Sequence, residues 1–129
     1  VMFHAGDPRY RWSRPEKIKR ILHEFPRLVV IAAHMGGWSS QETAFPLLKN
    51  EERCFVDTSS SLCTLPVDKA MRYIRGYGAE RVFFGSDYPV GEPAEHIRAL
   101  LRLPLTDEQT EKIARKNAES FFGSLKNKS

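Results

Sequence analysis

The chain has 129 residues, a length typical of one domain. Apolar residues make up 41% and charged residues 28%, glycine and proline recur without a period, and no apolar run approaches the roughly 18 residues of a membrane span. These values exclude disordered, collagen-like and transmembrane classes. Lysine and arginine number 20 against 16 acidic residues, and the resulting net charge of +4 suits an anionic small molecule or nucleic acid without deciding between them.

Four short apolar runs predict four β-strands, at residues 1–3, 28–33, 54–56 and 82–84. The second run is rich in β-branched residues and shows no alternation of apolar and polar side chains. This pattern is typical of a strand that is covered on both faces in a parallel sheet.

The first helix is predicted between the first two strands. Ser13 is expected to be its N-cap and Glu16 the third helical residue of a capping box, and the helix should end before Pro26. Apolar side chains recur at helical spacing in this segment, at Ile18, Ile21, Leu22 and Phe25.

The second helix is predicted from another capping box, which runs from Ser39 to Glu42, and Pro46 is expected to kink it or end it early. The third helix is predicted over about residues 67–77, and Gly78 provides a natural stop.

Two helices are predicted after the fourth strand. One follows Pro93, and the last begins at a capping box that starts with Thr106 and ends near residues 122–123; the tail after it is expected to be a solvated end.

This alternation of strands and helices predicts an α/β fold with a parallel sheet and right-handed crossovers. A complete (β/α)₈ barrel needs about 250 residues, so the four units predict either half of such a barrel or a small open sheet. No segment has the composition of an interior linker, and residues 1–129 are predicted to be one domain.

Polar residues follow each predicted strand, and they suggest a functional site. His4, His34, Asp57 and Asp87 are separated by one βα unit each, and parallel strands end at the same edge of a sheet. Imidazole nitrogens together with carboxylate oxygens are typical ligands of a catalytic Zn²⁺ ion, which activates a water molecule or polarises a substrate oxygen. The sequence therefore predicts a divalent metal site, with Zn²⁺ as the default and Mn²⁺ as the alternative.

Four motifs together resemble the C-terminal half of amidohydrolase-2 proteins, a branch of the amidohydrolase superfamily. They are His4-Ala5-Gly6, Ala33-His34-Met35-Gly36-Gly37, Gly85-Ser86-Asp87-Tyr88-Pro89 and Asn117-Ala118-Glu119-Ser120-Phe121-Phe122. The branch includes aminocarboxymuconate-semialdehyde decarboxylase and other metal-dependent decarboxylases and hydrolases. The resemblance implies that the chain forms strands five to eight of a TIM barrel, with their helices.

The resemblance also implies roles for three residues. His4 would be a metal ligand, His34 the catalytic imidazole that holds or polarises the metal-bound water, and Asp87 a metal-bound carboxylate that takes part in proton transfer. The family's His-x-His or Glu-x-His pair on the first barrel strand has no counterpart in this sequence. The opening at Val1 is interpreted as a cut end, with the N-terminal half of the barrel absent.

Three further residues in the loops after the first two strands are candidate substrate contacts. Arginine binds carboxylates bidentately and tryptophan offers an apolar wall, so Arg9, Trp12 and Trp38 suit an unsaturated or aromatic carboxylic acid. A solvated loop is the alternative for all three. No nucleic-acid-binding motif accompanies the basic segment 9–14, so neither nucleic acid nor membrane is predicted as a partner.

Structural roles are expected for other polar residues. Asp57 is interpreted as an acceptor for turn amides, His23 and His96 as surface residues of helices, and Asn117 as a side chain that binds backbone groups. Cys54 and Cys63 do not form a CxxC motif, and no signal peptide is present at the start, which together favour reduced thiols in the cytoplasm.

The predicted function is therefore a metal-dependent hydrolase that uses a metal-activated water on a small carboxylate-, amide- or ester-bearing substrate. A metal-dependent decarboxylase and a non-catalytic scaffold without the first-strand ligands are the alternatives. Four parallel strands leave two unpaired edges and an uncovered inner face. An N-terminal half-barrel or a second copy of the chain is therefore predicted to complete the sheet.

Overall fold

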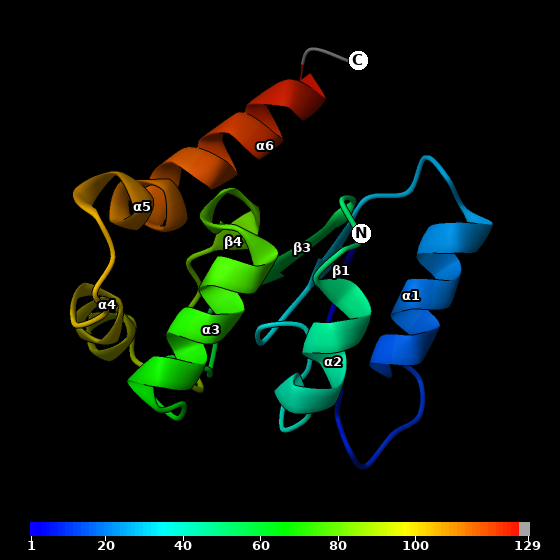
Figure 1. Cartoon of the computed structure of the whole chain (residues 1–129), viewed down its shortest axis with the longest axis horizontal. Coiled ribbons are helices and arrows are strands. Elements are labelled where there is room, and N and C mark those ends of the chain that lie inside the picture. Colours follow the sequence, from blue (N-terminus) through cyan, green and yellow to red (C-terminus); the bar gives the residue numbers. More distant parts are fainter. Residues whose placement is uncertain (127–129) are drawn as a thin grey trace.

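A computed structural model describes the backbone of residues 1–126 and the side chains of residues 1–124. Strands and helices alternate along the chain as predicted (Figure 1). They are β1 (Met2–Phe3), α1 (Pro15–Glu24), β2 (Val30–Ala32), α2 (Gln41–Leu48), β3 (Cys54–Asp57), α3 (Val67–Tyr77), the 3₁₀ turn η1 (Ala79–Arg81), β4 (Val82–Phe83), α4 (Pro93–Leu101), α5 (Asp107–Glu111), the π-helical segment η2 (Lys112–Lys116) and α6 (Asn117–Lys126).

The four strands form one parallel sheet in the order β1-β2-β3-β4, which confirms the predicted α/β class. Each strand lies beside its sequence neighbour, so every connection passes over the sheet through a helix. The register pairs Met2 with Ile31 and Ile31 with Phe55, so the polar residues after each strand come to one edge of the sheet.

One face of the sheet is covered by α1, α2 and α3, which lie side by side in Figure 1. Strand side chains that point toward these helices are fully buried: Val30, Ala32, Cys54, Val56 and Val82. From the helices, Leu22 and Ile74 are buried in the same core. The predicted positions of α1 and α3 are confirmed, because their apolar side chains recur on the face that meets the sheet.

The opposite face of the sheet carries aromatic side chains. Phe55 and Phe83 stack with their ring centroids 5.4 Å apart, and Phe121 of α6 contacts both rings edge-on. The last helix therefore covers part of the face that would point into a barrel, while the other part of that face remains as an open pocket.

Two of the three predicted capping boxes are wrong. The N-cap of α1 is Arg14, because Pro15, which lacks an N–H, takes the first helical position, and no side chain caps this end. The N-cap of α2 is Ser40, which makes no side-chain cap; its hydroxyl instead lies 3.4 Å from the Gly6 carbonyl oxygen. Helix α2 continues two residues beyond Pro46 and then ends.

The third capping box, at Thr106, is confirmed. Its hydroxyl accepts the Gln109 N–H at 3.1 Å, and the Gln109 side chain accepts the Thr106 N–H at 3.1 Å. The helical segment that follows extends to Lys126, past the predicted end at residues 122–123. The predicted solvated tail lies outside the described residues after Lys126.

The outer strands β1 and β4 do not have equivalent edges. The Phe84 N–H, just after β4, donates to the Ile113 carbonyl oxygen at 2.9 Å, and Ile113 lies in the π-helical segment, where the regular helical hydrogen bonds are shifted. Asn117 fixes the same region, as predicted, because its side-chain amide donates to the carbonyls of Ala79 and Val82 at 2.7 and 2.8 Å.

Cys54 is buried and Cys63 is exposed, and both are free thiols. Across residues 1–126, no helix combines the length and hydrophobicity that crossing a bilayer requires.

Candidate active site

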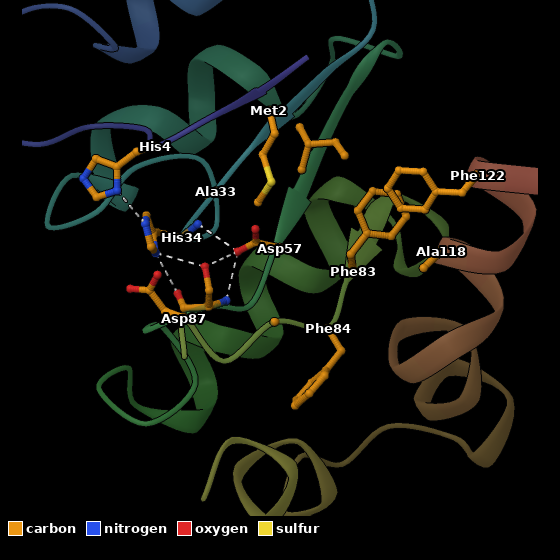
Figure 2. A pocket seen from close by; sticks show the side chains of 13 residues that line it. Met2, His4, Ala33, His34, Asp57, Phe83, Phe84, Asp87, Ala118 and Phe122 are labelled. Atoms are coloured by element: carbon orange, nitrogen blue, oxygen red, sulfur yellow. Dashed lines mark hydrogen bonds between the residues drawn. The ribbon is translucent and has the colours of Figure 1, made fainter. Parts of the chain in front are cut away.

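The ends of the four strands surround a cavity of about 400 Å³ on the uncovered face of the sheet (Figure 2). Its polar end is formed by residues that follow the strands, and its apolar end by Met2, Ile31, Phe83 and Phe122. His4, His34, Asp57, Ser59 and Asp87 all line this one cavity. The predicted convergence of distant polar residues is therefore present in the structure.

His34 is 2% exposed, and its imidazole is held from the loop after β3. Ring atom Nδ1 lies 3.0 Å from the Ser59 carbonyl oxygen and 3.0 Å from the Ser59 hydroxyl. A carbonyl oxygen only accepts hydrogen bonds, so Nδ1 carries the proton and Nε2 keeps its lone pair, which lies against His4 Nδ1 at 2.9 Å; this tautomer is assigned from the hydrogen-bond network. The arrangement suits a base that takes a proton through Nε2.

The backbone of His34 adopts a left-handed conformation with a φ of 61°, and so does the next residue, Met35, with a φ of 56°. Residues other than glycine rarely adopt this conformation, and they do so where the surroundings enforce it. Here the His34 N–H donates to the Asp57 carboxylate at 3.1 Å and the Met35 N–H donates to the Asp57 carbonyl at 2.7 Å. β3 therefore fixes the turn that aims the imidazole.

His4 lies directly against His34, with the Nδ1 atom of His4 2.9 Å from the Nε2 atom of His34 and the rings edge to face. The other ring nitrogen of His4, Nε2, lies 3.7 Å from the Asp7 carboxylate. About half of the His4 side chain is exposed, and the Trp38 ring lies beside it at a centroid distance of 6.2 Å. His4 is therefore accessible to a ligand at the mouth of the cavity.

Asp7 is buried and binds the Arg9 guanidinium through both carboxylate oxygens, at 3.1 and 2.8 Å. Hydrogen bonds from the Arg9 side chain, and then from its backbone, lower the pKa of Asp7 from 3.8 to about 2, although burial opposes the shift. The same pair raises the pKa of Arg9. The carboxylate beside His4 thus stays ionised over the whole neutral range.

Replacing Asp7 with asparagine is expected to lower the free energy of unfolding near neutral pH. The free energy of unfolding should then also fall less steeply as the pH is lowered. The pKa of Asp7 is lowered on folding, so its contribution is complete above about pH 4 and is lost as the pH falls toward 2. Because the Arg9 side chain is largely exposed, solvent screens the pair and the effect should be small. Urea unfolding at pH 7, 4 and 2 measures it, and an unchanged acid profile in Asp7→Asn would contradict this assignment.

Asp57 accepts hydrogen bonds from the loop that follows it, which confirms its predicted structural role. Its Oδ1 atom accepts the Ser59 N–H at 2.9 Å and the His34 N–H at 3.1 Å, and it also accepts the Ser59 hydroxyl. The side chain is buried, and it binds both His34 and Ser59, the residue that holds the imidazole. Asp57 therefore supports the site from below.

Asp87 projects from the loop after β4 and is exposed. Its Oδ2 atom accepts the Ser60 hydroxyl at 2.7 Å, and its backbone is left-handed with a φ of 66°. The Asp87 carbonyl accepts the N–H groups of Val90 and Gly91 at 2.8 and 3.1 Å, which closes a tight turn. The carboxylate is thus held at the cavity by a hydrogen bond from Ser60 to one of its two oxygens.

The residues present include two candidate donors for a metal ion. His4 and Asp87 offer one imidazole and one carboxylate at the rim of the same cavity, which are suitable donors for a divalent cation. Within residues 1–126, however, no three histidine, cysteine, aspartate or glutamate side chains come close enough together to hold a metal ion by themselves. Further ligands from outside this set are therefore required for a complete site.

The three candidate substrate contacts occupy different environments. Trp38 lies beside His4, whereas the Arg9 guanidinium is already bound to Asp7. The Trp12 side chain is 81% exposed, with the Lys17 ammonium 5.9 Å from its ring centroid. None of the three lines the cavity described above.

Sequence reasoning missed three residues that shape the site: Asp7, Ser59 and Ser60. Ser59 holds the His34 ring, and Ser60 holds the Asp87 carboxylate. The partners of Ser59 and Ser60 are 25 and 27 residues away along the chain, so no local pattern reveals these two. Asp7 lies only two residues from its partner Arg9. The cluster of small polar residues after β3, at the cavity edge of the sheet, was the available signal.

His23 is a surface residue, as predicted, and pairs with Glu51 at 3.1 Å. The prediction for His96 is wrong. It is 3% exposed, because it lies on the face of α4 that also carries the buried Leu100.

The sequence family described as amidohydrolase matches the chain over residues 1–124. No curated protein matches it.

Among solved structures, the chain is similar to an uncharacterised TIM-barrel protein from Bordetella bronchiseptica, at 28% identity and a TM-score of 0.72, over 84% of this chain and 39% of that one. It is also similar to 2,6-dihydroxybenzoate decarboxylase from Rhizobium, at 15% identity and a TM-score of 0.68, over 95% and 50% of the two chains. A third is 5-carboxyvanillate decarboxylase from Novosphingobium aromaticivorans, in complex with manganese, at 18% identity and a TM-score of 0.66, over 84% and 38%.

The chain spans half or less of the length of each of these three structures. Together with the parallel sheet, the matches confirm the predicted partial TIM-barrel fold.

Proposed function

The chain belongs to the amidohydrolase family, and we propose that it supplies the proton-transferring residue and part of the metal shell of a metal-dependent hydrolase. The contact between His34 Nε2 and His4 Nδ1, at 2.9 Å, carries this proposal. It brings a base with a fixed tautomer next to a candidate metal ligand at the mouth of a cavity.

A divalent cation held there by His4 and Asp87 would polarise a substrate oxygen or lower the pKa of a water molecule. His34 accepts a proton at Nε2, and the proton on Nδ1 remains bound to the Ser59 carbonyl. Ser60 holds the Asp87 carboxylate in place, and the apolar end of the cavity would contact the apolar part of the substrate. His4 and Asp87 are the proposed metal ligands.

The lining of the cavity favours a small substrate that has a polar group at one end and an apolar body at the other. The polar group would lie against the two histidines, and the body against Ile31, Phe83 and Phe122. Trp38 beside His4 is the proposed wall at the entrance. Arg9 and Trp12 are proposed as outer contacts, and Arg9 would have to exchange Asp7 for a substrate carboxylate.

Decarboxylation is the second candidate reaction, because removal of a carboxylate uses the same polarised oxygen and a proton donor. Similarity to two structures named as decarboxylases favours including it. A non-catalytic scaffold is the third candidate, and the incomplete metal shell favours it.

We also propose that residues 1–129 act as one half of a barrel whose other half is a further part of the polypeptide or a second copy of the chain. The open inner face and the edge of β1 support this. The two free cysteines support a cytoplasmic location.

Metal removal is the experiment that tests the proposed function. The protein expressed from its full coding sequence is expected to lose most of its activity after chelation and to regain it with Mn²⁺ or Zn²⁺. Release of CO₂ from 2,6-dihydroxybenzoate measures decarboxylation, and cleavage of aryl esters and amides measures hydrolysis. Metal-independent turnover would contradict the proposal, and a folded protein without either activity or bound metal would favour the scaffold.

A further inference from the structure

The loops that follow β3 and β4 are joined at two points beyond the end of the sheet. The first point is Thr58, directly after β3, whose N–H donates to the Phe83 carbonyl at 3.0 Å, as in a regular strand. The Thr58 hydroxyl then accepts the Gly85 N–H at 3.0 Å and donates to the Gly85 carbonyl at 3.1 Å. This side chain therefore takes the place of a main-chain partner and continues the pairing of the two chains.

Glycine at position 85 permits this close approach of the two loops. A Cβ atom there would lie 3.3 Å from the Cβ atom of Ser59, the residue that holds the His34 imidazole. Thr58 is fully buried, so loss of its hydroxyl would leave the Gly85 N–H without an acceptor that water could easily replace. The Thr58 hydroxyl thus fixes the register between the two loops.

The second point lies two residues further along each loop. The Ser60 hydroxyl donates to the Oδ2 atom of Asp87 at 2.7 Å, and the Ser60 carbonyl accepts the Thr64 hydroxyl at 2.9 Å. Ser60 and Asp87 both have left-handed backbones, with φ values of 51° and 66°, which side chains adopt where their surroundings enforce it. In the part of the chain that the structure describes, Oδ1 of Asp87 accepts no hydrogen bond.

We propose that Thr58 and Ser60 are positioning residues for Asp87. Thr58 sets the register of the two loops through Gly85, and Ser60 then holds Oδ2, which leaves Oδ1 as the single carboxylate oxygen for a cation. Gly85 and Asp87 line the cavity, so the effect of this register reaches the site directly. The inference rests on the proposed function, because it assumes that Asp87 binds the metal.

The experiment compares Mn²⁺ affinity, measured by electron paramagnetic resonance, in variants of the protein expressed from its full coding sequence. Thr58→Val keeps the branched shape and removes the hydroxyl, and Ser60→Ala removes the donor to Asp87. Each is expected to weaken Mn²⁺ binding by about 10- to 100-fold, the range seen when outer-shell partners of metal ligands are lost. Thr58→Ser, which keeps the hydroxyl, should retain the parent affinity. Thr43→Val, a matched change at an exposed threonine of α2, should also retain it.

Hydrogen exchange of the Gly85 amide provides a second readout that does not depend on metal. This amide should exchange at least about tenfold faster in Thr58→Val, because its acceptor is lost, and at the parent rate in Thr58→Ser. It should stay protected in Ser60→Ala, where Thr58 is intact. Parent-like exchange in Thr58→Val would overturn the role of Thr58. If Thr58→Val does not fold, Thr58→Ala replaces it with the same expected results.

Asp87→Asn separates the two levels of the proposal. Loss of Mn²⁺ affinity in Asp87→Asn together with parent-like affinity in Thr58→Val and Ser60→Ala would overturn the positioning roles alone, even if the thermal midpoint of these variants fell. Parent-like affinity in one of the two would overturn the role of that residue. Unchanged Mn²⁺ affinity in Asp87→Asn would overturn the metal-binding role of Asp87, and with it the function proposed above.

Discussion

Replacing His34 with asparagine is expected to lower kcat/KM by about 10²- to 10⁴-fold, the usual contribution of a general acid–base residue. The asparagine amide can take the place of Nδ1 and donate to the Ser59 carbonyl, but it offers no lone pair where Nε2 meets His4. Asparagine also tolerates the left-handed backbone at this position, where φ is 61°. The fold should therefore remain while the base is lost.

Steady-state kinetics with the substrate identified in the metal-dependent assay measures this effect, and circular dichroism checks the fold. His23→Asn, at an exposed histidine paired with Glu51, is the matched control and should keep its activity. Full activity in a folded His34→Asn variant would contradict the assignment of His34 as the base.

Replacing Asp57 with alanine is expected to lower the free energy of unfolding by about 3 to 5 kcal/mol, or about 15 °C in the thermal midpoint. The change leaves two buried backbone N–H groups, those of His34 and Ser59, without their carboxylate acceptor. Unpaired buried donors are among the few causes of losses this large.

Asp57→Asn distinguishes support from catalysis. Its side-chain carbonyl can still accept the two backbone N–H groups, so we expect it to lose about half as much stability or less and to retain activity. Thermal unfolding and kinetics measured on the same samples test this, and Asp68→Ala on the exposed surface of α3 is the control. A stable but inactive Asp57→Asn variant would show that Asp57 takes part in the reaction itself.

The strands and the site could both be predicted from one feature of the sequence. Each apolar run ends at a polar residue, and in a parallel sheet those ends share one edge, so the meeting of His4 with His34 followed from spacing alone. Helix starts were less predictable. Ser13 and Ser39 have the right chemistry for N-caps, but Pro15 shifts the first helix by one residue and Ser39 adopts a positive φ of 58°.

The supporting contacts of the site could not be predicted, because they join loops that are distant along the chain. Nothing local in the sequence distinguishes Ser59 or Ser60 from ordinary turn residues. The pair of Asp7 and Arg9 differs, because the two residues are only two positions apart and sequence reasoning overlooked it. His96 was assigned to the surface because of its charged neighbours. Its helical spacing to Leu100 and Leu103, both buried, was the stronger indicator.

The hydrogen bond from Phe84 to Ile113 covers the outer edge of β4, so the two edges of the sheet are not equally open to a second molecule. Copies that joined β4 of one molecule to β1 of the next could continue without limit, as head-to-tail contacts do when they fail to close. The final helical segment hinders such pairing, because a strand that joined β4 would first have to displace the Ile113 carbonyl from the Phe84 N–H. Within the described residues no such contact covers the outer edge of β1, so a neighbouring strand is favoured there, and open-ended growth from β4 is disfavoured.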